Sequence, residues 1–345
     1  MSPITHDDAH RSPNPSAPVA AIQYSETMVV EDWEARWLAG SVPSRWPYGL
    51  DELGAHGFEV RHTRAADRLD SDVLFGFDER VAPKLLAGPG PRVCGAIWVC
   101  EPRARQIGSP RTLLRGIGEL RSLRRMDHVI CYSTAMAAKL PGLLRIPAER
   151  VSFVPLGIDP DFYQPSSYED SRLVLSVGND RSRDTRTLYA AFRHMLAEDP
   201  HLEIVVQTSD PAPAPAGVRR VSRFRDHAEL KEYYRRAAVV AIASRPNLYT
   251  SGSTVALEAQ AVGRPVIISN TPGMESYVED GLSGFLTEPG DHRAIATAAL
   301  SILRNPEKGD QMGRVGSARV RSENTIFTMT QHIAAVFGGV LARRA

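Results

Sequence analysis

Two successive series of short apolar segments constrain the fold of this chain more than any other feature of its sequence. The runs lack strict apolar–polar alternation, as expected for parallel strands that are covered on both faces. The first series consists of VAAIQYSE, GFEVRHTRA, SDVLFGFD, RVCGAIWVCEP and DHVICYS. After the connector ERVSFVPLGIDPDFYQP, a second series contains RLVLSVGND, LEIVVQT, AVVAIAS and GRPVIIS. The pattern predicts two α/β units, with a ligand cleft at the carboxyl ends of their facing strands.

The length of 345 residues also suits two domains. Residues 1–17 are expected to form a disordered tail, because the segment MSPITHDDAHRSPNPSAP has four prolines and resembles neither a signal peptide nor a spanning helix. We expect one α/β domain over residues 18–165 and a second over residues 168–322. A C-terminal amphipathic helix within residues 323–345 is expected to cross back onto the first domain.

The composition limits the classes of binding partner and the cell compartments that suit this chain. The chain has 41 Lys and Arg against 40 Asp and Glu, so its net charge of +1 does not call for a nucleic-acid partner. Three cysteines in largely apolar surroundings are typical of a protein in a reducing cytoplasm. The ten histidines do not have the spacing of metal ligands, so we predict no metal site.

The stretch YTSGSTVALEAQAVGRPVIISN, residues 249–270, predicts a loop, a helix and a buried strand. Small and hydroxyl-bearing residues open this helix, and all of the hydroxyl-bearing ones can act as N-caps: Thr250, Ser251, Ser253 and Thr254. Gly252 allows a ligand to approach the backbone closely. Because the first turn of a helix has free N–H groups and a partial positive charge, it can bind a phosphate.

Glu258 is the one acid among the small and apolar residues of the same helix. A carboxylate near a buried surface needs a partner, and a ribose diol could supply two donors. The alternative is a well-capped core helix whose glutamate meets an arginine. The motif alone leaves both interpretations open.

The order of these segments resembles one enzyme family. The run from VVAIASRPNLYTSGSTVALEAQAVGRPVIISN to AIATAALSIL, together with VICYSTAMAAKL and ERVSFVPLGIDPDFY, looks like the retaining GT-B glycosyltransferases of family four, the glycosyl transferases group 1. The resemblance covers residues 128–303. It implies the GT-B fold, with an N-terminal acceptor-binding domain and a C-terminal nucleotide-sugar-binding domain, both Rossmann-like, facing a central cleft. It also implies transfer of a hexosyl or pentosyl group from a nucleotide diphosphate sugar with retention of configuration and without a metal.

The resemblance also implies an acceptor that is a small molecule, a saccharide or a lipid-linked sugar, as in polysaccharide or glycoconjugate biosynthesis. In the family, two glutamates eight positions apart flank the glycine-rich turn. The second binds the ribose and corresponds to Glu258. The first lies near the donor sugar, and its position is taken here by Thr250.

The family's phosphate-binding pair follows the first glycine of the second domain, which corresponds to Gly178. With a one-residue deletion, the pair falls on Asn179 and Arg183. An arginine can replace the family's lysine, with bidentate geometry and a permanent charge. Asn179 carries no charge, and Arg181 or Arg245 could compensate for it. We also include Arg223 and Phe224 among the candidate nucleotide-sugar contacts.

A histidine of the first domain often contacts the donor sugar in this family. Here the strand AIWV is followed by CEPRARQ, so Glu101 and Arg103 occupy its place. The missing histidine and glutamate would suit a deoxysugar or pentose donor. They also suggest an inactive nucleotide-sugar-binding subunit. A second alternative is a GT-B-fold sugar-nucleotide epimerase, which would need an acid and a histidine at the cleft.

The segment PRTLLRGIGELRSLRR, residues 110–125, carries five arginines and an apolar stripe at helical spacing. One interpretation is a helix packed on the core with a solvated face. The other is a surface that meets an anionic membrane, which would place the protein peripherally at the inner face of the cell membrane. Trp46 and Tyr48 lie where the family has its acceptor-facing loop.

Overall fold

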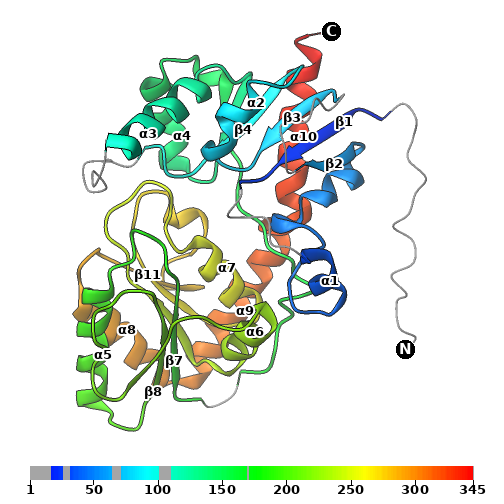
Figure 1. Cartoon of the computed structure of the whole chain (residues 1–345). Coiled ribbons are helices and arrows are strands. Elements are labelled where there is room, and N and C mark those ends of the chain that lie inside the picture. Colours follow the sequence, from blue (N-terminus) through cyan, green and yellow to red (C-terminus); the bar gives the residue numbers. More distant parts are fainter. Residues whose placement is uncertain (1–16, 26–31, 64–70, 101–109, 169–170, 345) are drawn as a thin grey trace, which may run out of the picture.

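The computed structural model of the chain describes residues 17–25, 32–63, 71–100, 110–168 and 171–344. Two lobes are visible in Figure 1, each built around one sheet. The predicted tail lies outside the described residues, apart from residue 17. None of the helices in the described ranges has both the length and the apolar character needed to cross a membrane.

The first sheet has six parallel strands in the order β2-β1-β3-β4-β5-β6. They are β1 (Val19–Gln23), β2 (Glu59–Thr63), β3 (Val73–Gly76), β4 (Arg92–Ala96), β5 (His128–Cys131) and β6 (Val151–Phe153). The connecting helices are α1 (Trp33–Leu38), η1 (Pro47–His56), η2 (Glu79–Val81), α2 (Ala82–Leu85), α3 (Pro110–Leu123), α4 (Thr134–Leu144) and η4 (Ala148–Arg150).

The second sheet also has six parallel strands, in the order β12-β11-β10-β7-β8-β9. They are β7 (Leu173–Val177), β8 (Glu203–Gln207), β9 (Val218–Val221), β10 (Val239–Ile242), β11 (Val266–Ser269) and β12 (Gly284–Thr287). The helices are α5 (Thr185–Glu198), α6 (His227–Arg236), α7 (Ser253–Ala261), η5 (Met274–Ser276), α8 (His292–Leu303), α9 (Pro306–Glu323) and α10 (Ile326–Ala342).

Burial on both faces explains the apolar runs. Every residue of β3, β5, β7, β10 and β11 is buried. Each sheet separates two apolar clusters, one on each face; in the second domain Val240 and Ile242 belong to one cluster, and Val239 and Ala241 to the other. The prediction of two parallel α/β sheets is therefore confirmed.

The last helix of the chain packs on the first sheet rather than on the second. Phe337 of α10 lies 5.5 Å from Phe75 of β3, ring centroid to ring centroid, and Ile333 joins the same apolar cluster. The chain crosses between the domains at Asn324, whose amide donates to the Leu156 carbonyl at 3.0 Å. The two crossings of the chain, near Leu156 and Asn324, therefore lie side by side.

The carboxyl ends of the two sheets face each other. Tyr277 follows η5 in the second domain, and its hydroxyl donates to the Tyr132 carbonyl at the end of β5, at 2.6 Å. A Cβ added to Gly273 would lie 2.7 Å from Ser133 Oγ of the first domain. The loops that follow β5 and β11 are thus in contact across the domain boundary.

Candidate functional site

The start of α7 lies at the carboxyl end of β10, where the chain turns back through two left-handed residues. Thr250 has φ 52 and Gly252 has φ 103. The N-cap is Gly252, and no side chain caps the helix. The N-cap position thus falls on a glycine and on none of the four hydroxyl-bearing residues that could act as N-caps, and the hydroxyl of Ser251 donates to Asp180 Oδ1 at 2.6 Å.

Arg183 lies against this uncapped helix end. A Cβ built on Gly252 would be 2.5 Å from Arg183 Nη1, and one on Gly178 would be 2.5 Å from Arg183 Nε. Both glycines therefore leave room for the guanidinium. Its Nη2 donates to the Val177 carbonyl at 3.2 Å and its Nη1 to Ser244 Oγ at 3.4 Å.

The electrostatics at this point favour an anion. Arg183 Nε is buried and has no hydrogen-bond partner among the described residues. Burial lowers the pKa of Arg183, while the nearby Asp180 opposes that shift. The guanidinium and the helix N-terminus both carry positive charge and lie next to each other, so an anion bound there would interact favourably with both.

Asp180 fixes the loop 178–183 to the start of α7. Its carboxylate accepts from Ser251 Oγ, from the Tyr249 hydroxyl at 2.5 Å and from the Ser182 backbone N–H at 3.0 Å. These hydrogen bonds hold the pKa of Asp180 below its usual range, although burial opposes them. The acid is thus ionised and already satisfied within the loop.

Glu258 is buried in α7, with 6% of its surface exposed. Its two oxygens accept hydrogen bonds from tyrosine hydroxyls, Tyr163 at 3.0 Å and Tyr234 at 2.8 Å. Burial raises the pKa of Glu258 to about 7, against the lowering effect of both hydrogen bonds. The core-helix alternative required an arginine as the partner of Glu258, whereas its hydrogen-bond partners are two tyrosines. The role of Glu258 toward a ribose stays a prediction.

The other predicted residues fall in several places. Asn179 accepts from the Ser209 backbone N–H at 2.5 Å, and Arg245 Nη2 donates to the Arg181 carbonyl at 2.5 Å. Arg223 is exposed, whereas Phe224 is buried in a core cluster.

Thr250 and Thr254, two of the predicted site residues, differ sharply in solvent exposure. Thr250 is 1% exposed and its Oγ1 has no partner among the described residues, while Thr254 is exposed. Glu101 and Arg103 lie outside the described residues. Ser253 is the first residue of α7, Gly252 is its N-cap and Ser251 precedes the N-cap.

The first domain contributes a stack of three aromatic side chains, Tyr48, Phe77 and Tyr132, of which the sequence singled out only Tyr48. Tyr48 stacks on Phe77 with ring centroids 3.8 Å apart, and Phe77 stacks on Tyr132 at 4.8 Å. Trp98 is the second residue after β4 and lies three residues before the position proposed for the donor-sugar contact. An aromatic residue just after a buried strand was the available signal. Trp46 stacks on His62 at 4.2 Å, so it packs within its own domain.

Within the described ranges, no group of three His, Cys, Asp or Glu residues could hold a metal ion.

Comparison with known proteins identifies proteins that are similar to this chain in sequence and in structure. Residues 171–305 match the family model described as glycosyl transferases group 1. A D-inositol 3-phosphate glycosyltransferase from Geodermatophilus obscurus is 30% identical over 236 residues, which are 60% of this chain and 50% of that protein. One from Thermobispora bispora is 27% identical, over 60% of this chain and 54% of that protein. The chain thus spans about half the length of these curated relatives.

Solved structures share the whole architecture. A sucrose-phosphate synthase from Thermosynechococcus elongatus matches with a TM-score of 0.71 at 18% identity, over 94% of this chain and 100% of that chain. The Anabaena protein Alr3699/HepE in complex with UDP-glucose matches with a TM-score of 0.67 at 16% identity, over 93% and 99%. These likenesses confirm the predicted GT-B fold.

Proposed function

We propose that this chain, whose residues 171–305 match the glycosyl transferases group 1 family, transfers a sugar from a nucleotide diphosphate sugar to an acceptor with retention of configuration. The observation that carries the proposal is Arg183, whose Nη1 lies at the uncapped start of α7 and whose buried Nε, beside Gly178, has no hydrogen-bond partner among the described residues. This arrangement suits a diphosphate. Glu258, one to two turns further along α7, would bind the ribose of the same ligand.

The chemistry requires stabilisation of a leaving group. As the bond between the anomeric carbon and the diphosphate breaks, negative charge collects on the departing phosphate oxygens. Fixed cations and helix N–H groups aimed at those oxygens stabilise that charge without reorganisation. Arg183 and the first turn of α7 would supply them, so the proposed reaction needs no divalent metal.

The donor and acceptor are proposed by class. A UDP-glucose-type donor is the first choice, because the Anabaena neighbour is described with UDP-glucose. A phosphorylated cyclitol is the first acceptor to try, because the curated relatives are named for D-inositol 3-phosphate. Saccharides and lipid-linked sugars are the other acceptor classes.

A second candidate is an inactive subunit that binds a nucleotide sugar without transferring it. The observation that favours it is Thr250, a buried residue at the position where the family has the first of its two glutamates. Such a protein would bind the nucleotide sugar as tightly as an active enzyme, and it would release no nucleoside diphosphate.

One assay separates the two functions. The protein is incubated with a panel of nucleotide sugars, with and without acceptors, and free nucleoside diphosphate is measured. We expect release that depends on acceptor and that continues at an unchanged rate in excess chelator. Binding without release would favour the inactive subunit, and reversible loss of activity in chelator would contradict the metal-independent mechanism.

We also propose that the protein works in the cytoplasm and contacts the inner face of the cell membrane through α3. Leu114 is 68% exposed and Ile117 is 38% exposed, so part of the apolar stripe of this helix does not pack on the core. Arg121, Arg124 and Arg125 are exposed at its end. Apolar side chains next to arginines suit a surface of anionic lipids.

A vesicle assay tests this contact. We expect the protein to sediment with phosphatidylglycerol vesicles and not with phosphatidylcholine vesicles, and Leu114→Gln with Ile117→Gln should reduce the bound fraction several-fold. Phe327→Gln on α10 is the matched control, since Phe327 is 50% exposed and lies on another helix. Equal losses in both variants, or no binding by the wild type, would overturn the proposed contact.

A further inference from the structure

Trp98 carries two guanidinium groups over its ring, one from each domain. Arg80 Cζ lies 4.8 Å from the centroid of the Trp98 ring, and Arg181 Cζ lies 4.9 Å from it. Both distances are within the range of cation–π attraction. Arg80 belongs to η2 in the first domain, whereas Arg181 belongs to the loop 178–183 in the second domain. The Trp98 ring is therefore a contact between the two domains.

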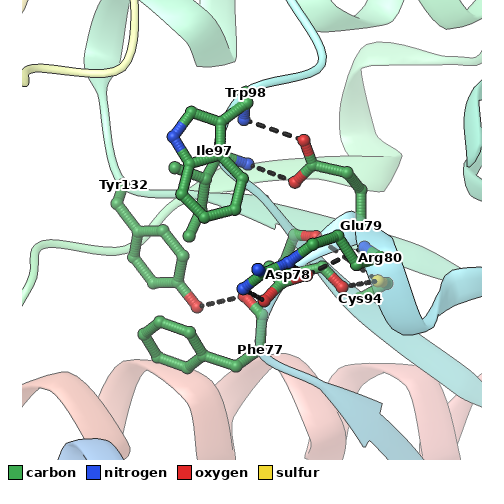
Figure 2. Close-up of polar contacts among 9 residues, drawn as sticks. Phe77, Asp78, Glu79, Arg80, Cys94, Ile97, Trp98 and Tyr132 are labelled. Carbon is green, nitrogen blue, oxygen red and sulfur yellow. Dashed lines mark hydrogen bonds and ion pairs between the residues drawn. The ribbon is translucent and has the colours of Figure 1, made fainter. Parts of the chain in front are cut away.

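Three consecutive residues of the first domain hold Trp98 in place (Figure 2). The buried Glu79 carboxylate accepts from the backbone N–H groups of Ile97 and Trp98, both at 2.9 Å. Asp78, which is 1% exposed, binds Arg80 through Nε at 2.9 Å and Nη2 at 2.7 Å. Glu79 thus fixes the backbone of Trp98, and Asp78 fixes the guanidinium that lies over its ring.

On the other side of the boundary, Arg181 is part of the loop that Asp180 attaches to the start of α7. Its carbonyl accepts from Arg245, and Arg183 follows two residues later. A diphosphate carries at least two negative charges. Arg183 and the helix end supply about one and a half positive charges between them, and the ionised Asp180 on the same loop offsets part of this charge. A second arginine on the loop would bring the charge that faces the ligand closer to balance.

We propose that Trp98 is a positioning residue that holds Arg181 as a second cation for the diphosphate of the donor. This inference rests on the proposed function and deepens it. A guanidinium stacks through its face and binds phosphate oxygens through the N–H groups in its plane, so Arg181 can do both at once. Because Trp98 belongs to the first domain, the full positive charge at the diphosphate is assembled only when the two domains are in contact.

Calorimetry with uridine diphosphate, and with guanosine diphosphate as a second probe, tests the proposal. We expect Trp98→Leu and Arg181→Gln each to weaken binding about 3- to 30-fold, the effect of losing one cation–π contact and the charge that it holds. Trp98→Phe should restore most of the affinity, because it keeps an aromatic face. The double variant should bind no more weakly than Arg181→Gln alone, since the two residues act as a unit.

Controls keep the outcomes distinct. Arg186→Gln removes an exposed arginine of α5 and should leave the affinity unchanged. Thermal unfolding verifies that each variant is folded, and Arg181→Gln remains informative if Trp98→Leu is not. The role of Trp98 would be overturned by wild-type affinity in the Trp98→Leu or Arg181→Gln variant, or by additive losses of affinity in the double variant. Either result would leave the proposed function intact. A wild-type protein that binds neither diphosphate would overturn both.

Discussion

Replacing Arg183 with alanine should lower kcat of glycosyl transfer by about two to three orders of magnitude, the usual effect of removing one contact that stabilises charge in a transition state. Arg183 lies at the start of α7 with a buried Nε that has no partner in the described part of the chain. Its charge is therefore already in position before a ligand binds. Charge grows on the departing diphosphate during the reaction, so the loss should exceed the effect on substrate binding.

Arg183→Lys is the informative companion. It keeps a positive charge and loses the planar guanidinium, so we expect it to recover part of the activity. Arg186→Ala controls for a general loss of positive charge, because Arg186 is exposed on α5, three residues away in the sequence. Steady-state kinetics on folded variants provides the measurement. Near wild-type turnover in Arg183→Ala would mean that the one-residue gap used to place Arg183 is wrong.

The two sheets could be predicted from the sequence because strands that are buried on both faces appear in it as continuous apolar runs. The run GRPVIIS predicts a buried strand, and all four residues of β11 are buried. Glu258 was likewise expected to be near a buried surface from its apolar neighbours. Local patterns of this kind depend only on residues close in sequence, so they can be read without knowing how the domains are placed.

The contacts of the site could not be predicted in the same way. Tyr163 is 95 positions from Glu258, and Trp98 meets Arg181 only because two domains come together. The partner of the Ser251 hydroxyl is similarly distant in sequence, since the hydroxyl donates to Asp180, 71 positions earlier. A hydroxyl can cap its own helix or bind a distant acid, and sequence alone does not decide between them.

Glu258→Gln should weaken the binding of both the free nucleoside diphosphate and the nucleotide sugar by about 10- to 150-fold, the effect of losing a charge-assisted hydrogen bond of ~1.5–3 kcal/mol. Thr250→Ala should leave the affinity for the free nucleotide almost unchanged and alter only turnover or the choice of donor. The two residues are at opposite ends of one proposed ligand. Calorimetry with the nucleoside diphosphate provides the measurement. Equal losses of affinity in both variants, or no loss of affinity in Glu258→Gln, would mean that α7 is only a core element.

The pH dependence of wild-type binding gives an independent measure of the same carboxylate. Burial raises the pKa of Glu258 to about 7, so the group is mostly protonated at pH 6 and mostly ionised at pH 8. The ionised form is the better acceptor for a diol, so affinity should rise with pH, by about tenfold over this interval if only that form binds.

The tyrosines around Glu258 should not obscure this rise. Burial raises the pKa values of Tyr163 and Tyr234 well above 10, so both hydroxyls stay protonated between pH 6 and 8, and it lowers the pKa of His227, which favours the neutral imidazole. Tyr48, whose pKa burial raises to about 12, also stays protonated. The ligand should be a nucleotide sugar, whose diphosphate does not titrate there. If Glu258 binds the ribose, Glu258→Gln should lose the rise, and a slope that persists in this variant would assign it to another group.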